Sequence, residues 1–502
     1  MSLSTPDSPQ EALDEAAVRA APASRAEASG RLERLPRAAL WVMLGRGLGI
    51  GSTLLATIIV PRLVAPREFG ELTSLLSVVT FAAIMAQLGL GHTCLRFLSE
   101  SLARHDHGRI GRTLRLATVV LAAASLATCG ITALCLWLYG ESLFQLEHIA
   151  WLNPLASVLI LLMAWQQFSA ESLRGLHELR WASLLSGGTF GGPLPVLLSL
   201  GLLACVALRF QPTITVTLVC QIAGSGVSLL VSVHCLRATL HSVYRNNVLA
   251  SAATPCPPPL TLESMLRVSL PMAVFHFFIM LMQTADIWIA AGYVSLGYIS
   301  LEEVAVYGVA RRYVVLLNVP TQLAVNTVIS SIPDLYTRGQ LDELQTLLRR
   351  SATLTAIATI AASLLCMLAG GWLMGVLSGV FYQRAATALA ILSLGQIAVS
   401  LLGSGGMTLA MTGRQTAAMW ICCGSALFLC ILGPLAASRW GIEGIAASAA
   451  GALALQAGAE WLVCRQMTGI WTHADFRPAA LQSLGGGLVS WRRFAGNSQD
   501  AP

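Results

Sequence analysis

Long apolar segments alternate with short polar segments along the chain from residue 39 onward. Each apolar segment has about the 20 residues that a helix needs to cross the hydrocarbon core of a bilayer. Inside lipid, backbone polar groups must be hydrogen-bonded within the protein, so these segments are predicted to be helices. The pattern predicts twelve membrane spans, at residues 39–61, 71–91, 114–139, 149–170, 182–207, 213–236, 265–293, 304–330, 352–378, 386–411, 416–437 and 442–464.

The positive charges between these segments predict the orientation of the chain. All 31 basic residues are arginines, because the sequence contains no lysine. With the N-terminus in the cytoplasm, 23 arginines fall on the inner side and five fall in the outer loops. Since cytoplasmic loops carry the excess of positive charge in membrane proteins, we expect both termini to be cytoplasmic.

A long polar interruption with a proline-rich run, Pro255–Pro259, divides the spans into six and six. Short features recur in both halves at offsets of 231 to 238 residues, and parallel repeats of this kind are typical of transporters. The tail either lies on the anionic inner leaflet or frays into solution. The predicted parts are a disordered cytoplasmic arm (1–37), a first six-helix bundle (38–237), a cytoplasmic linker (238–264), a second six-helix bundle (265–464) and a cytoplasmic tail (465–502).

Composition excludes several classes of protein. Hydrophobic residues make up 55% of the chain and charged residues 11%, against about 25% charged in a soluble domain. The absence of lysine excludes a P-loop and a Schiff-base cofactor, so no cofactor is expected. The net charge of +6 is not gathered on one face, so no nucleic-acid partner is expected. The twelve cysteines form no CxxC pair and are interpreted as packing residues rather than metal ligands.

A polar stripe runs along the predicted span 304–330. Its members recur at helical spacing on one face of the helix, at Tyr307, Arg311, Asn318, Gln322 and Asn326. A charged residue inside a span costs about 2.5–3.5 kcal/mol on insertion scales, so Arg311 is a candidate for function. We expect the stripe to face a wet cavity, with Pro320 kinking the helix. The alternative is that Arg311 extends to the outer interface.

Three further polar residues are candidates for the same site. Arg46 lies in a glycine-rich turn of the first span, and either lines the cavity or reaches the phosphates of the inner leaflet. Asp286 is interpreted as a partner of Arg311, as a proton or cation site, or as a residue close to the outer interface. His276 is a candidate proton relay, although a hydrogen-bonded interior histidine is the more common case.

Several motifs resemble those of polysaccharide flippases. These flippases are the Wzx-type O-antigen and exopolysaccharide exporters of the multidrug/oligosaccharidyl-lipid/polysaccharide (MOP) superfamily. The resemblance covers residues 38–470. The motifs that carry it are Pro66-Arg67-Glu68-Phe69-Gly70, Leu88-Gly89-Leu90-Gly91, Leu173-Arg174-Gly175-Leu176, Val306-Tyr307-Gly308-Val309-Ala310-Arg311 and Thr412-Gly413-Arg414.

The resemblance implies an all-α, polytopic transporter rather than an enzyme. Its substrate would be a polyprenyl-pyrophosphate-linked oligosaccharide, moved from the inner to the outer leaflet of a bacterial inner membrane by alternating access. Arg46 and Arg311 would hold the pyrophosphate, and Asp286 and the stripe would modulate the charge of the cavity. Membrane lipids, a polysaccharide polymerase and glycosyltransferases are the implied partners. Arg46 also resembles a cavity arginine of the related lipid II flippases, although the serine that flanks it there is absent here.

Two other functions remain as alternatives. One is an ion-coupled multidrug (MATE-type) antiporter of the same superfamily, whose cavities use acidic residues. The excess of arginine over deep acids disfavours it. The other is a non-transporting membrane scaffold for glycosyltransferases. A scaffold has no need of a polar stripe inside the membrane, so the stripe argues against it.

Overall fold

The computed structural model of the protein describes residues 41, 43–103, 106–144, 149–185, 192–246, 261–329 and 331–477. Over these residues all regular secondary structure is helical, which confirms the predicted all-α class. The first helix spans Met43–Leu63. The helices that follow are α2 (Pro66–Met85), α3 (Leu90–Ala103), α4 (His107–Phe144), α5 (Ile149–Gly175), α6 (Leu179–Leu185), α7 (Pro193–Ala207), α8 (Ile214–Asn246), α9 (Leu262–Ser295), α10 (Leu301–Leu317), α11 (Val319–Val328), α12 (Ser331–Thr337), α13 (Leu341–Leu377), η1 (Val380–Ala385), α14 (Ala386–Leu402), α15 (Gly405–Met411) and α16 (Gln415–Thr468).

Helices fall at all twelve predicted spans. Nine helical segments among the described residues are long and apolar enough to cross a membrane. The predicted span 304–330 divides into α10 and α11, and the predicted span 182–207 includes the shorter apolar helix α7. The last two predicted spans both lie in α16, which changes direction at Gly441, where φ is +55°. The protein is therefore a multi-pass membrane protein, as predicted.

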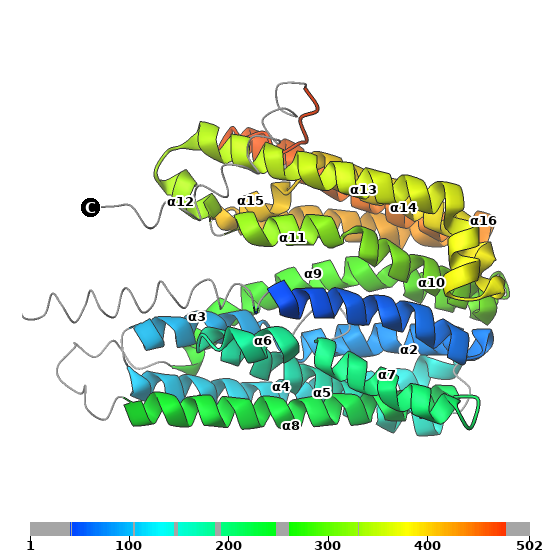
Figure 1. The fold of residues 1–502 in the computed structure, drawn as a ribbon, viewed down its shortest axis with the longest axis horizontal. Helices are drawn as coiled ribbons and strands as arrows, with labels where there is room; N and C mark the ends of the chain where they lie inside the picture. The colour runs from blue at the N-terminus through cyan, green and yellow to red at the C-terminus, as the bar shows by residue number, and fades with distance from the viewer. Residues whose placement is uncertain are drawn as a thin grey trace, which may run out of the picture.

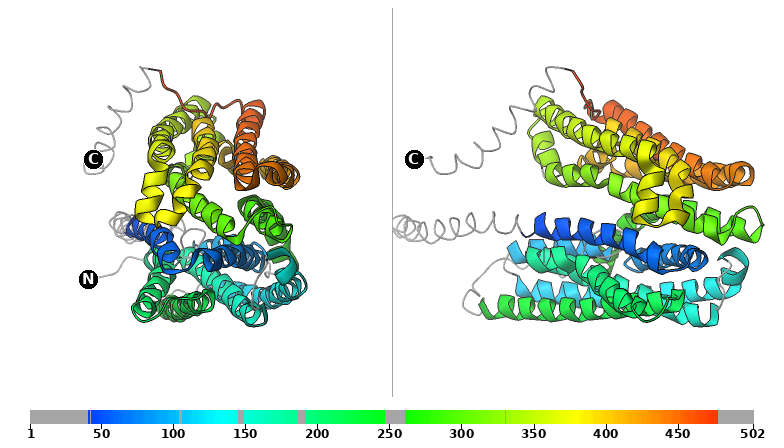
Figure 2. Two further views of the ribbon diagram at one scale, coloured as in Figure 1. Left: turned by 90° about the vertical axis from the view of Figure 1, so that its right-hand side faces the viewer. Right: turned by 45° about the vertical axis from the view of Figure 1, so that its right-hand side comes forward.

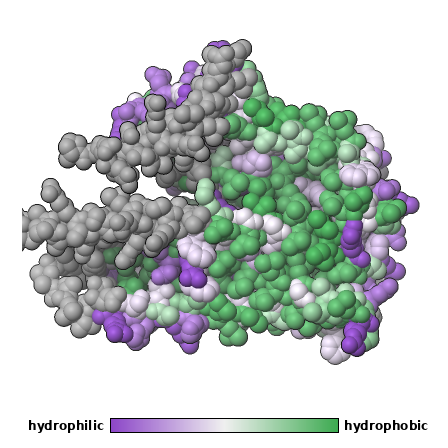
Figure 3. Space-filling view, viewed as in Figure 1, coloured by the Kyte–Doolittle hydropathy of each residue, from purple (hydrophilic) through white to green (hydrophobic). Residues whose placement is uncertain are grey.

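The surface has the distribution of polarity that a bilayer requires. Figure 3 shows a broad hydrophobic face over the middle of the molecule, with hydrophilic residues gathered toward its two ends. Large hydrophobic side chains exposed on the surface include Trp137, Leu230, Leu368 and Trp420. Apolar patches of this size are rare on soluble monomers, and here they run parallel to the long helices. The long axis of the helices is therefore the direction in which the protein crosses the membrane.

The helices form two groups that lie side by side. The first helix and α2–α8 form one group and α9–α16 form the other, with α9 and α10 lying along the seam between the groups (Figures 1 and 2). Across the seam, α2 packs against both α9 and α10. The predicted arm, residues 1–37, lies outside the described residues, as does most of the predicted linker. The predicted domain boundaries therefore stay predictions.

Breaks in the helices place polar residues at the seam. Leu88 and Gly89 have φ of +46° and +70°, which ends α2 and starts α3 in a new direction. A β-carbon at Gly89 would lie 2.6 Å from the carbonyl oxygen of Ser269 on α9, so only glycine fits there. The predicted kink at Pro320 is confirmed, because α10 ends at Leu317 and proline occupies the first turn of α11.

The start of the predicted tail packs onto the second group of helices. Residues 469–477, which we call the C-terminal strap, follow α16 in non-helical conformation. The backbone N–H of Ala474 donates to the carbonyl oxygen of Leu401, and the hydroxyl of Thr472 donates to that of Leu402. These bonds satisfy carbonyls left open at the end of α14. This part of the tail is therefore packed on α14 and not frayed, and its position relative to the inner leaflet stays a prediction.

Candidate functional site

A cavity of about 730 Å³ lies at the seam between the two groups of helices. The first helix, α2, α3, α5 and α6 line it from one side, and α9, α10 and α11 line it from the other. Its polar lining residues are Arg46, Thr53, Thr80, Gln87, His92, Gln167, Glu171, Arg174, Ser183, His276, Gln283, Asn318 and Gln322. A polar cavity that both groups share is a site whose shape depends on their relative position.

The two groups touch closely on one side of this cavity. Toward the end at which α2 begins, the indole N–H of Trp288 donates to the Ser77 hydroxyl at 3.0 Å. Gly70 packs so closely on α10 that a β-carbon would lie 2.1 Å from the carbonyl oxygen of Leu301. Arg62 donates to the carbonyl oxygen of Val376 near the same end. The cavity lies beyond these contacts, toward the end at which the first helix begins.

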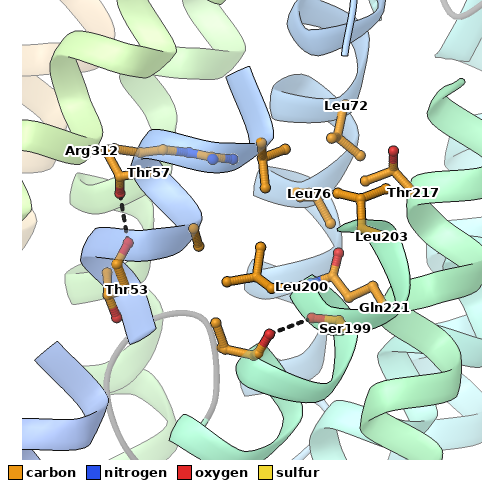
Figure 4. A pocket seen from close by; sticks show the side chains of 13 residues that line it. Thr53, Thr57, Leu72, Leu76, Ser199, Leu200, Leu203, Thr217, Gln221 and Arg312 are labelled. Carbon is orange, nitrogen blue, oxygen red and sulfur yellow. Dashed lines mark hydrogen bonds between the residues drawn. The ribbon is translucent and has the colours of Figure 1, made fainter. Parts of the chain in front are cut away.

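A second and much smaller pocket lies beside the contacts that close this end. Figure 4 shows the Arg312 side chain reaching from α10 toward Thr57 and Leu72, on the first helix and α2. The guanidinium lies 4.8 Å from the centre of the Phe69 ring. The pocket holds about 70 Å³, which suits a few water molecules and is too small for a lipid head group. Arg312 therefore connects the two groups of helices and does not line the large cavity.

Two arginines face the large cavity from the first group of helices. Arg46 lies in the first two turns of the first helix, with its side chain exposed in the cavity. Arg174, at the end of α5, donates from Nη1 to both carboxylate oxygens of Glu171, at 2.8 and 2.9 Å. Arg174 thus shares its charge with a carboxylate on its own helix, and Arg46 contributes most to the positive charge of the cavity.

Arg311 is not among the residues that line the cavity, although it was predicted to face it. Its Nε lies 2.6 Å from Oδ2 of Asp286, and its Nη2 donates to the carbonyl oxygen of Gln283 at 2.8 Å. The Tyr307 hydroxyl donates to the same Asp286 oxygen at 2.8 Å. Asp286 is 1% exposed: its Oδ2 faces α10, and its Oδ1 accepts from the backbone N–H of Ile287 on its own helix at 2.9 Å. Asp286 and Arg311 therefore form an ion pair, which was one of the three interpretations of Asp286 from the sequence.

The break before α11 divides the polar stripe in two. Tyr307 and Arg311 bind Asp286, whereas Asn318 and Gln322 line the cavity. Oδ1 of Asn318 accepts a hydrogen bond from Gln396 on α14 at 2.9 Å, which orients the amide. The side chain of Asn326 lies outside the described residues. The part of the stripe that reaches the cavity is therefore the part on and after the break.

A pair of histidines meets across the seam. His276 on α9 and His92 on α3 line the cavity with their rings stacked, 5.1 Å between centroids and 28° between planes. Nδ1 of His276 lies 2.7 Å from the carbonyl oxygen of Met272. A carbonyl oxygen only accepts, so this nitrogen carries the proton and Nε2 of neutral His276 is free to take another. The bond to Met272 thus fixes the orientation of the His276 ring beside His92.

Sequence reasoning missed His92, Glu171 and Arg174 as cavity residues. His92 follows the glycine motif at the start of α3, and only the break at Gly89 turns it toward α9. Glu171 and Arg174 have the i, i+3 spacing of an intrahelical ion pair, a signal that also fits an ordinary solvated helix end. Among the described residues, no group of three or more side chains could hold a metal ion, and every cysteine is free.

Solved structures show which fold this is. An inward-facing MATE multidrug resistance transporter of the MOP superfamily has a TM-score of 0.59 and 15% identity, over 84% of this chain and 94% of that chain. The MATE multidrug transporter DinF-BH, solved as a complex, has a TM-score of 0.60 and 14% identity, over 87% and 95%. The lipid II flippase MurJ, in an inward closed conformation, has a TM-score of 0.58 and 11% identity, over 85% and 87%. The protein therefore has the fold of the MOP superfamily, as its motifs implied.

Comparisons by sequence lead from the fold to a family. No curated protein sequence matches the chain. A family model described as "Polysaccharide biosynthesis protein" matches residues 35–333. That match includes the first helix, α2–α11 and all the residues that line the cavity. Because the match extends over more than half of the 502 residues, the chain belongs to the polysaccharide biosynthesis protein family.

Proposed function

We propose that the protein moves a polyprenyl-pyrophosphate-linked oligosaccharide from the inner to the outer leaflet of a bacterial inner membrane. The observation that carries this proposal is the cavity of about 730 Å³ between the two groups of helices, with Arg46 and Arg174 on its wall. The family match supports a role in polysaccharide synthesis, and the fold is shared with the structure of a lipid II flippase.

The size and charge of the cavity suit the head group of such a lipid. Cavities of roughly 300–1,000 Å³ hold ligands of drug size, comparable to a pyrophosphate with its first sugars. A charged pyrophosphate is very costly to transfer into hydrocarbon without compensating partners. The guanidiniums of Arg46 and Arg174 replace part of its hydration, because their planar forks match phosphate oxygens in pairs. The prenyl tail is too long for the cavity and stays in the surrounding lipid.

Alternating access requires the contacts at the closed end to open. The bonds from Trp288 to Ser77 and from Arg62 to Val376 connect the two groups there, together with Arg312 on Phe69. We place the arm and both termini in the cytoplasm, from the distribution of arginines. In that orientation the described cavity is on the cytoplasmic side of these contacts, where a newly made lipid-linked oligosaccharide would bind. Glycosyltransferases and a polysaccharide polymerase are the partner enzymes in this scheme.

The charges on the cavity wall disfavour the multidrug antiporter. Among the described residues that line the cavity, Glu171 supplies the one carboxylate, and Arg174 binds both of its oxygens. A lipophilic cation would have to compete with Arg174 for this carboxylate, next to the positive charge of Arg46. Asp286, the other deep acid considered from the sequence, is 1% exposed and bound to Arg311.

Ligand-dependent thermal stability of the purified protein tests this function. A ligand that binds only the folded state stabilises it by RT ln(1 + [L]/Kd), about 2.7 kcal/mol at 100 times Kd. We expect undecaprenyl pyrophosphate to raise the Tm, and Arg46→Ala to remove most of that increase. Arg46→Lys should restore only part of it, since an ammonium lacks the fork. Arg439→Ala, an exposed arginine at the bend in α16, serves as the matched control and should respond as the wild type does.

Two results would overturn the proposal. If lipophilic cations raise the Tm and undecaprenyl pyrophosphate does not, the antiporter is the better function. If vesicles that contain the protein translocate no fluorescent polyprenyl-pyrophosphate oligosaccharide to a leaflet reached by an impermeant quencher, binding does not lead to transport. The Arg46→Ala protein should show the lower translocation rate in the same vesicles.

A further inference from the structure

We infer that His92 and His276 form a proton-linked anion subsite, in which the two imidazoles take up protons when the pyrophosphate binds. The inference rests on the proposed function, because it assigns a role to residues of that same cavity. The two rings come from opposite sides of the seam, α3 and α9, and stack at a centroid distance of 5.1 Å. They therefore meet only while the two groups of helices are in the described arrangement.

The geometry leaves both rings available to an anion in the cavity. Both histidines line the cavity, and His92 is exposed in it. The bond from Nδ1 of His276 to the Met272 carbonyl holds that ring in place and leaves the lone pair of the neutral ring on Nε2. Imidazole has an unperturbed pKa of about 6.5, so a modest change of environment moves its charge across neutral pH.

Binding of an anion changes the balance between the neutral and the charged rings. In the empty cavity two imidazolium groups in stacking distance repel each other, which favours at least one neutral ring. A pyrophosphate beside the pair attracts both positive charges and accepts hydrogen bonds from them. The protonated rings are then more stable in the complex than in the free protein, so protons from solution are taken up on binding. By linkage, lowering the pH strengthens binding.

The other charges that line the cavity with the pair come from two elements, α5 and the first helix. Glu171 and Arg174 on α5 and Arg46 on the first helix line the same cavity, and the first two form their own ion pair. The parts of α2, α10 and α11 that line it carry uncharged side chains. Three charged groups on other elements packed against α3 or α9 are bound away from the pair: Arg109 of α4 lies 4.0 Å from Glu100, Arg311 of α10 binds Asp286, and Glu460 of α16 accepts from Gln456.

This arrangement assigns the pair a role that the arginines cannot perform. Arginine keeps its charge at every physiological pH, so Arg46 and Arg174 attract the pyrophosphate but do not change protonation when it leaves. The histidines can lose protons once the ligand departs. Because one ring lies on each side of the seam, a bound pyrophosphate with two protonated histidines joins the groups of helices. Substrate binding, protonation and the described arrangement of the two groups of helices are thereby linked.

Calorimetric titration with a soluble prenyl pyrophosphate, farnesyl pyrophosphate, tests the inference. Titrations in buffers of different ionisation enthalpy report the number of protons taken up on binding. Uptake of one proton with each ligand makes the affinity change by up to about tenfold for each pH unit. We expect net proton uptake between about pH 8 and pH 5.5 in the wild-type protein, and a smaller uptake in His92→Asn and in His276→Gln.

Comparison between variants separates the histidines from the ligand's own titration. The double variant His92→Asn/His276→Gln keeps Arg46 and Arg174, so it should still bind at pH 8, with only the pH dependence that the pyrophosphate itself contributes. His241→Gln, an exposed histidine on α8, should match the wild type. If the double variant binds with the same proton uptake as the wild type, the inference is wrong and the proposed function is untouched. If neither protein binds farnesyl or undecaprenyl pyrophosphate at any pH, both are wrong.

Discussion

The buried ion pair between α9 and α10 predicts a large loss of stability when one partner is removed. Asp286 is 1% exposed and Arg311 is 17% exposed, with 2.6 Å between Oδ2 and Nε. At an effective dielectric constant of 20, unit charges at that separation attract by roughly 6 kcal/mol. Desolvation of both groups offsets most of this attraction. Asp286→Leu instead leaves the Arg311 guanidinium buried without its carboxylate, which we expect to cost about 3–5 kcal/mol of unfolding free energy.

A double-mutant cycle measures this coupling. The single variants Asp286→Leu and Arg311→Met and the double variant are unfolded in mixed micelles by increasing mole fractions of SDS, with helix content as the signal. Each single change leaves one charge buried, whereas the double change removes both charges. We therefore expect the double variant to be at least as stable as either single variant. If the two single effects add within about 0.5 kcal/mol, the groups do not interact and the reasoning is refuted.

The same variants decide what Arg311 does in transport. If Arg311 serves only to hold α10 against α9, the double variant regains translocation together with stability. If it contacts the pyrophosphate, as the sequence implied, the double variant is stable and inactive. Tyr307→Phe is the control, because it removes one hydrogen bond to Asp286 and leaves both charges in place.

Three further predictions concern packing and the C-terminal strap. Gly70→Ala should lower stability by about 1–3 kcal/mol in the SDS assay, because its β-carbon would meet the backbone of Leu301. Asp475→Ala should expose the strap to protease, since it removes the carboxylate that lies 3.0 Å from Arg349. Burial and the nearby Arg349 lower the pKa of His473, so the unfolded chain binds the proton more readily. Thermal stability should therefore decrease as the pH falls below about 6.5.

Each of these predictions has a matched comparison. Gly51→Ala meets no atom within 4 Å of the added carbon and should not destabilise, so equal losses at both glycines would contradict the packing argument. Protease cleavage of the Asp475→Ala strap at the wild-type rate would show that the ion pair does not retain it. His473→Gln should flatten the decrease of Tm between about pH 7 and pH 5, and an unchanged slope would assign the pH effect to other groups.

Local sequence chemistry determined the elements of the fold. Apolar length predicted the spans, because a bilayer accepts only helices whose backbone is satisfied internally. Proline at the start of α2 and α7, and the break at Pro320, follow from the missing N–H and fixed φ of proline. The glycine motif Leu88-Gly89-Leu90-Gly91 was visible in the sequence as a family feature, and at Gly89 it corresponds to a left-handed backbone position. These properties depend on a few neighbouring residues.

Tertiary structure alone decided which polar residues meet. From helical spacing, Arg311 and Gln322 share one face, yet the break between α10 and α11 and the proximity of Asp286 separate them. His92 and His276 are 184 positions apart, and no local pattern relates them. Their contact depends on how two groups of helices are placed across the seam. A sequence determines each helix through local hydrogen bonding and hydrophobicity, whereas a shared cavity depends on the packing of the entire chain.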